Sequence, residues 1–251
     1  MIDQRLFAAP RALDRDRDRR QRLKSPAAVR FDRTAGINSL FIAAAEFIDA
    51  ARDYPIVFIE AGVGDDGKRE VAPVVVLGLA PGENLMLEPD GSWAADYVPA
   101  LLRGYPLGLV RSDEQSYVIV VDEQADALSE SEGERLFDDA GGLTPLLDER
   151  RQYLERLETE GQRTRLLGRS LLELDLLRPM RFEATLPDGQ RLSVDGFLTV
   201  DEKLFGALPP ERVLPLHQSG VLGTIYAHLF SLGLMRTLVE RRVRRAAPVP
   251  A

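Results

Sequence analysis

Residues 55–80, PIVFIEAGVGDDGKREVAPVVVLGLA, decide the fold class, because they hold two apolar runs separated by a polar connection. The runs 55–62 and 71–80 are rich in β-branched and aromatic residues, which is the composition typical of strands. Glycine and aspartate between the runs favour a short turn. We therefore predict two neighbouring strands at this point of the chain.

The segments on either side of this pair extend the prediction. Apolar residues between positions 40 and 51 recur at helical spacing, which predicts an amphipathic helix over 39–53, capped by Asn38 or Ser39 and ended by Pro55. Downstream, NLMLEPDGSW at 84–93 contains a Pro-Asp-Gly turn, so we expect an antiparallel meander. A short helix over 97–103, capped by Asp96, then precedes strands at 107–110 and 117–121 of the same sheet.

The second half of the chain is mainly helical. Leucines three and four apart predict a long helix over 144–177, with a break at Gly161 or Gly168. A β-hairpin follows at 180–200 around Pro187-Asp188-Gly189, then a short helix from Asp201 and a final helix over 222–243. We therefore predict an α+β fold, in which an antiparallel sheet formed by the meander and the later hairpin packs against long helices.

Composition limits the class of protein. The 251 residues are 45% hydrophobic, enough for one α+β domain, which we place at 36–245 before a disordered tail at 246–251. The chain has no cysteine, which excludes disulfides, thiolate metal sites and cysteine nucleophiles. A net charge of -8 argues against a general nucleic-acid-binding role.

Residues 1–35 form a basic segment that contrasts with the acidic remainder. Mixed charge runs are typical of solvated surfaces, so we expect an N-terminal arm that lies on the acidic body. The arm could instead contact nucleic acid or an anionic membrane surface. We see neither a secretory signal nor a transmembrane segment, because the longest apolar run, 71–80, is interrupted by a proline and a glycine. The expected location is cytoplasmic.

Three patterns suggest cofactor or metal chemistry without its full signature. Residues 62–67 match G-x-G-x-x-G, but a strand follows where a dinucleotide site needs a helix, so we predict a hairpin loop. Asp14, Asp16 and Asp18 resemble the start of a calcium loop, yet Arg19 occupies the glycine position. His217 and His228 on one helix would be about 16 Å apart. We therefore expect no cofactor and no metal.

The aromatic group after residue 90 is the best candidate for a ligand site. Trp93, Tyr97, Arg103 and Tyr105, followed by Pro106, would allow a guanidinium to stack on an aromatic ring. The same residues could form the edge of the core, with their polar tips in water. His228, between two apolar residues, is either a half-buried structural histidine or a catalytic group. No nucleophile-elbow pattern accompanies it.

Several motifs in order then carry a family resemblance. They are AAEFIDAARDYPIVF, VAPVVVLGL, GENLML with GSWAADYVPALLRGYP, GERLFD, LLELDLLRPMRFEATLPDGQRLSVDGFLTVDEKLFGALP and IYAHLFSLGLMRTLVERR. Together they cover most of residues 38–242, and the chain resembles the bacterial SapC family.

The resemblance implies association with surface-layer or outer-membrane uptake gene clusters, beside transport receptors and oxygenase- or halogenase-like enzymes. No established catalytic residues come with it. The matching residues are candidates only for whatever the family does: Tyr54, Pro55, Trp93, Tyr97, Arg103, Tyr105, Pro106 and His228.

Two functions remain open from the sequence. The first is a non-catalytic intracellular accessory protein that binds a partner protein or peptide, with homo-oligomerisation left open. The alternative is an enzyme, or an enzyme subunit, that acts on a peptide or sugar ligand in a pocket formed by Tyr97, Arg103, His228 and neighbouring carboxylates.

Overall fold

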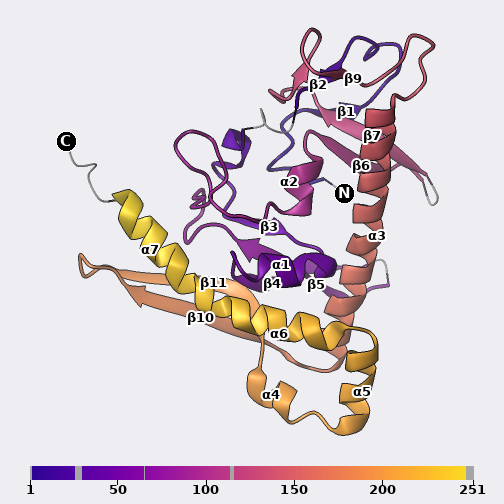
Figure 1. Cartoon of the computed structure of the whole chain (residues 1–251). Coiled ribbons are helices and arrows are strands. Elements are labelled where there is room, and N and C mark those ends of the chain that lie inside the picture. The colour runs from indigo at the N-terminus through magenta and orange to yellow at the C-terminus, as the bar shows by residue number, and fades with distance from the viewer. Residues whose placement is uncertain (1, 26–29, 65, 114–115, 247–251) are drawn as a thin grey trace. The chain divides into compact units, whose positions relative to one another are not determined.

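The structure, a computed structural model, describes residues 2–25, 30–64, 66–113 and 116–246. The fold is α+β, as predicted, and all of its strand pairs are antiparallel (Figure 1). The chain divides into two compact units that interleave along the sequence. The domain predicted at 36–245 contains segments of both units, and its first residue, Gly36, is also where the second unit begins. Of the tail predicted at 246–251, Ala246 ends α7 and residues 247–251 lie outside the described residues.

The first unit comprises Met1–Ala35, Leu87–Trp93 and Ala100–Gly161. One sheet has the order β1-β7-β6, from Pro10–Ala12, Tyr117–Asp122 and Leu107–Arg111. The other has the order β8-β2-β9, from Leu128–Ser129, Arg22–Leu23 and Glu134–Arg135. The unit also contains α2 (Ala100–Gly104) and the first part of α3 (Pro145–Glu173). Leucine, valine and phenylalanine side chains from both sheets and α3 form its core.

The described residues of the N-terminal segment, 2–25 and 30–35, are packed into this unit, which corrects the prediction of an arm. Strand β1 pairs with β7, and Leu6 and Phe7 are buried. Asp18 is almost fully buried and accepts two hydrogen bonds, at 2.6 and 2.8 Å, from the Arg11 guanidinium. The alternating charges therefore make local ion pairs that hold the segment in a fixed conformation.

The second unit comprises Gly36–Met86, Ala94–Pro99 and Gln162–Ala251. Its sheet has the order β10-β11-β4-β5-β3, from Leu177–Thr185, Arg191–Val200, Ile56–Val63, Arg69–Val76 and Ser39–Phe41. The hairpins predicted within 55–80 and 180–200 are both present, as β4–β5 over 56–76 and β10–β11 over 177–200. Of the motif at 62–67, Gly62 and Val63 end β4, and Gly64 and Gly67 lie in the turn before β5. The prediction of one sheet was wrong in part, because β6 and β7 belong to the first unit.

Helices complete the second unit: α1 (Phe47–Ala50), α4 (Glu202–Gly206), α5 (Pro210–Gln218), α6 (Val221–Ser231) and α7 (Met235–Ala246). Helix α6 packs against β4 and β11 of the sheet and against α1 and α5 (Figure 1). Asp201 caps α4 as predicted, because its carboxylate accepts the Lys203 and Leu204 amides.

Three predicted helices differ from the structure. Residues 39–53 form β3, a 3₁₀ turn and the four-residue α1, because Leu40 pairs with Val75 at the sheet edge. The helix expected at 97–103 is Ala100–Gly104, and the Tyr97 amide bonds to Asp53 rather than entering a helix capped by Asp96. Helix α3 continues without the expected break.

Gly168 explains why α3 can keep a glycine in its interior. A Cβ atom added there would lie 2.7 Å from the Val71 carbonyl oxygen, so the helix approaches β5 too closely for any side chain. The glycine is a packing requirement and does not end the helix.

Candidate functional site

The five candidate residues are divided between the two units. Trp93, Arg103 and Tyr105 belong to the first unit, and Tyr97 and His228 belong to the second. Each of the five makes separate contacts, and those contacts decide whether its side chain is available for catalysis or ligand binding.

His228 joins α6 to two strands. Its Nδ1 donates to the Ile56 carbonyl at 2.8 Å, and its Nε2 accepts the Val200 amide at 3.0 Å. Phe58 and Leu198 pair across β4 and β11, so the same register places Ile56 opposite Val200, two residues further along each strand. The imidazole therefore bridges two backbone groups that a longer ladder would join directly.

The protonation state of His228 follows from these contacts. Its side chain is fully buried, and burial lowers its pKa to about 4, although the hydrogen bond to Ile56 opposes the shift. A neutral imidazole with Nδ1 protonated is the form that can bond to both partners. Both ring nitrogens are occupied by backbone, so His228 has no nitrogen left to move a proton.

Ser231 is a second contributor that the sequence analysis missed. Its hydroxyl accepts the Ile56 amide at 2.9 Å and donates to the His228 carbonyl at 2.7 Å. Two side chains of α6, three residues apart, therefore satisfy both backbone groups of Ile56. The signal in the sequence is a histidine and a serine that share one face of an apolar helix.

Tyr97 is fixed at three points in the second unit. Its hydroxyl donates to Glu46 Oε1 at 2.7 Å, its amide donates to Asp53 Oδ2 at 2.8 Å, and its carbonyl accepts the Tyr54 hydroxyl. Glu46 is itself buried and accepts the Ala43 amide at 2.9 Å. This arrangement ties an irregular segment to the start of α1.

Trp93 and Arg103 pack on aromatic rings of the first unit. The Trp93 ring lies 5.3 Å from the ring of Phe31. The Arg103 guanidinium lies 5.7 Å from the centroid of Tyr153, so the expected cation–π contact exists with a different ring from those proposed. Both residues therefore hold segments of the unit together.

Tyr105 contacts a buried carboxylate. Its hydroxyl donates to Asp122 Oδ2 at 2.8 Å, and Asp122 also accepts the amides of Ala8, Ala9 and Gln124. Burial alone would raise the pKa of Asp122, but these hydrogen bonds outweigh it and hold the pKa below its usual range. Burial and the bond to Asp122 raise the pKa of Tyr105. The pair is a fixed anion and a fixed donor, unsuited to acid–base exchange at neutral pH.

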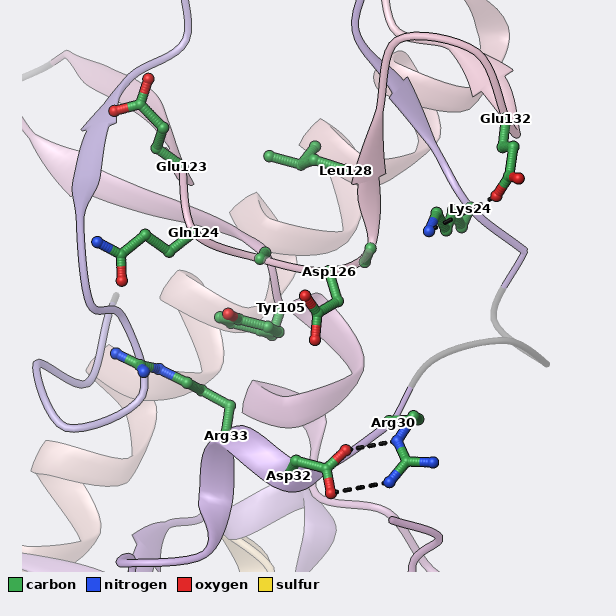
Figure 2. Close-up of a pocket in the computed structure, with 12 residues that line it drawn as sticks. Lys24, Arg30, Asp32, Arg33, Tyr105, Glu123, Gln124, Asp126, Leu128 and Glu132 are labelled. Carbon is green, nitrogen blue, oxygen red and sulfur yellow. Dashed lines mark hydrogen bonds and ion pairs between the residues drawn. The ribbon is translucent and has the colours of Figure 1, made fainter. Parts of the chain in front are cut away.

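A cavity of about 890 Å³ opens over the Tyr105 ring (Figure 2). We call it the Tyr105 cavity, and it is lined by Lys24, Arg30, Asp32, Arg33, Tyr105, Glu123, Gln124, Ala125, Asp126, Ala127, Leu128 and Glu132. Its walls are the 3₁₀ turn at Asp32–Thr34, the end of β2 and the 123–128 segment. Tyr105 is the one member of the five candidates that lines it.

Charges of both signs line the Tyr105 cavity. Two of its pairs are internally matched: Arg30 with Asp32 at 2.6 Å and Lys24 with Glu132 at 3.6 Å. Figure 2 shows Arg33 and Asp126 on either side of the Tyr105 ring, with the Asp126 carboxylate beside the ring and the Arg33 guanidinium extending away from Asp126. The cavity thus offers charged recognition groups over an aromatic floor.

Metal and membrane sites have little support. Across residues 2–25, 30–64, 66–113 and 116–246, no group of three or more histidine, aspartate or glutamate side chains is arranged to hold a metal ion.

By length and composition, Val221–Ala246 is the one helical stretch in the described chain that could cross a bilayer. Core helices of water-soluble proteins share that composition, and here His228 and Ser231 of this stretch bond to the sheet.

Comparisons with known proteins identify the family. No curated protein and no solved structure matches the chain. The family model described as SapC matches residues 15–238, which include most of both units and residues 15–35 of the segment predicted to be an arm. The chain therefore belongs to the SapC family.

Proposed function

We propose that the chain is a non-catalytic accessory protein that binds a partner protein. The observation that carries the proposal is an exposed aromatic surface, the α6 face, formed by Tyr226 and Phe230 of α6, with the buried Phe205 of α4 packed against Tyr226. The Tyr226 ring lies 5.5 Å from Phe205 and 6.1 Å from Phe230, and the second pair is stacked.

Exposure sets the α6 face apart. Phe230 is 78% exposed and Tyr226 is 45% exposed, while the opposite side of α6 is buried through Ile225, His228 and Ser231. Aromatic side chains that pack on each other yet remain in water are typical of protein interfaces, where they supply most of the binding energy. The His228 and Ser231 bonds hold α6 on the sheet, so the face is rigid before binding.

The chemistry of the face defines the partner. We expect an apolar pocket that accepts the Phe230 ring, with a hydrogen-bond acceptor at its rim for the Tyr226 hydroxyl, which bonds to none of the described residues. From the SapC resemblance, we expect the partner to be a component of a surface-layer or outer-membrane uptake system and the binding to take place in the cytoplasm. The hydrogen bonds of Tyr97 and His228 support a non-catalytic role. The Tyr97 hydroxyl bonds to Glu46 and both imidazole nitrogens of His228 bond to the backbone, so neither group is available to a substrate.

Site-specific crosslinking tests this proposal. A photoreactive residue at position 230 in the native host should crosslink one protein, which is then purified and titrated against the chain. The Tyr226→Ser/Phe230→Ser double variant should weaken that affinity at least about 100-fold, since two interface aromatics are removed. Leu166→Ser is the matched control, because Leu166 is an apolar residue of α3 that is 61% exposed.

Two results would count against the α6 face. The first is a stringent crosslink and pull-down that recover nothing above background. The second is a purified partner that binds the double variant as tightly as the unmodified chain. Equal losses in the double variant and in Leu166→Ser would indicate general instability rather than a lost interface.

A further inference from the structure

We propose that the Tyr105 cavity is a binding site for a zwitterionic ligand, an amino acid or short peptide with a free ammonium and a free carboxylate. The proposal is independent of the α6 face. It rests on two opposite charges, those of Arg33 and Asp126, which line one cavity and form no ion pair with each other or with other described residues.

Arg33 supplies the anion-binding end. Its Nε donates to the Leu6 carbonyl at 3.2 Å, which fixes the side chain and leaves its two terminal nitrogens without a partner among the described residues. Figure 2 shows the guanidinium near the Tyr105 ring, on the side away from Asp126. A planar guanidinium with two free N–H groups on one edge matches a carboxylate, which it can bind through two parallel hydrogen bonds.

Asp126 supplies the cation-binding end. It lies in the 123–128 segment across the Tyr105 ring from Arg33, and its oxygens accept no hydrogen bond from the described residues (Figure 2). Ala125 and Ala127 on either side are buried, so the backbone that carries Asp126 is held in place. An ammonium would meet a carboxylate here and the face of an aromatic ring nearby.

The floor of the cavity is held rigid. The Tyr105 hydroxyl bonds to Asp122, and the Tyr105 ring packs edge-on against Phe7 with centroids 5.4 Å apart. The other charges in the walls have partners: Lys24 pairs with Glu132, Arg30 pairs with Asp32, and Glu123 pairs with Arg11 outside the lining. Asp126 also acts weakly on Arg30, whose pKa is raised mainly by Asp32. A ligand that carries both charges satisfies Arg33 and Asp126 together, whereas a singly charged ligand leaves one of them unmatched.

Size is consistent with this class. A cavity of about 890 Å³ is within the range of about 300–1,000 Å³ that is usual for small-ligand sites. It has room for a short peptide, and Leu128 on one wall offers an apolar contact for a side chain. The expected ligands are therefore amino acids, dipeptides and tripeptides. Titration with each of the three shows which length the site binds most tightly.

Calorimetric titration of the full chain tests the site. The probes are alanine, dialanine and trialanine, the corresponding phenylalanine series, and each compound with its amino end acetylated or its carboxyl end amidated. We expect saturable binding of at least one free zwitterion and a loss of about tenfold or more when either end is blocked, since each block removes a charge-assisted contact.

Variants assign each end of the ligand. Arg33→Gln should lower the affinity for the free zwitterion about tenfold or more. Its affinity for the amidated compound should equal that of the unmodified chain, because amidation already removes the carboxylate contact. Asp126→Asn should likewise lower the affinity for the free zwitterion and leave the affinity for the acetylated compound unchanged, because acetylation already removes the ammonium contact. Arg20→Gln and Glu130→Gln make the same charge changes outside the cavity lining, and neither should alter the affinity.

Three outcomes would overturn the assignment: no saturable binding by any probe, blocked compounds that bind as tightly as free ones, or control variants that weaken binding as much as the cavity variants. Loss of the α6 partner has no bearing on these titrations. Failure of one proposal is therefore distinguishable from failure of the other.

Discussion

The buried histidine of α6 should make the stability of the protein depend on pH in a defined window. His228 is neutral in the folded state, with its pKa lowered by burial to about 4 from an ordinary 6.5. In the unfolded chain it is protonated below about pH 6.5, so the unfolded state binds more protons than the folded state between about pH 6.5 and 4. Stability is therefore full above that window and falls as the pH falls through it.

The size of the effect follows from the two pKa values. At about pH 5 the unfolded histidine is almost fully protonated and the folded one is mostly neutral. Linkage then gives a loss of about 2 kcal/mol in the free energy of unfolding between about pH 7 and 5 from this one group. The cause is the cost of placing a charge on a fully buried ring that packs against Phe58 and has both nitrogens held by the backbone of Ile56 and Val200.

Urea unfolding at the two pH values measures this loss. The unmodified chain should lose about 2 kcal/mol more than His228→Gln, which has no imidazole to titrate. His217→Gln is the control, because His217 is an exposed residue of α5, and it should behave as the unmodified chain does. Imidazole resonances give a second readout, in which His228 stays neutral at about pH 5 in the folded protein.

Two results would contradict a buried neutral His228: an equal pH-dependent loss in the unmodified chain and in His228→Gln, or a His228 resonance that titrates above about pH 6 in the folded protein. Either result would mean that the imidazole reaches water or an acidic partner, contrary to its two backbone bonds.

The remaining predictions concern packing and a buried carboxylate. Gly168→Ala should lower the free energy of unfolding by about 1–3 kcal/mol, because the new methyl group meets the Val71 carbonyl at 2.7 Å. Gly223→Ala, in an exposed position of α6 with nothing within 4 Å, should raise it by up to about 1 kcal/mol, and equal effects of the two substitutions would contradict this account. Tyr97→Phe removes the hydroxyl that bonds to Glu46 and should cost about 1–3 kcal/mol in the same urea assay, whereas an unchanged midpoint would show that the bond is dispensable.

Local patterns predicted the elements whose own sequence carries the information. The hairpins 56–76 and 177–200 form where β-branched runs flank a turn, and α3, α6 and α7 follow the apolar spacing. The prediction failed at 39–53, where helical spacing is overridden because Leu40 pairs with Val75 across the sheet edge. Such a pairing depends on a partner 35 positions away, which periodicity does not contain.

The candidate residues show the same limit. Their types were informative, since each of the five holds a specific bond or ring contact, but their grouping was not. Proximity along the chain joined Trp93, Tyr97, Arg103 and Tyr105, while the fold assigns Tyr97 to one unit and the other three to another. Arg33 and Asp126 were not singled out, because residues 93 positions apart carry no common local signal.

The sequence by itself determined the α+β class, the two hairpins, the long helices and the family, because each depends on local patterning or on motif order. Tertiary structure alone decided the role of His228, the pairing of β1 with β7 near the N-terminus and the composition of the Tyr105 cavity. These depend on which distant backbone and side-chain groups meet. A buried histidine and a catalytic one look alike in sequence, and only the groups around the ring distinguish them.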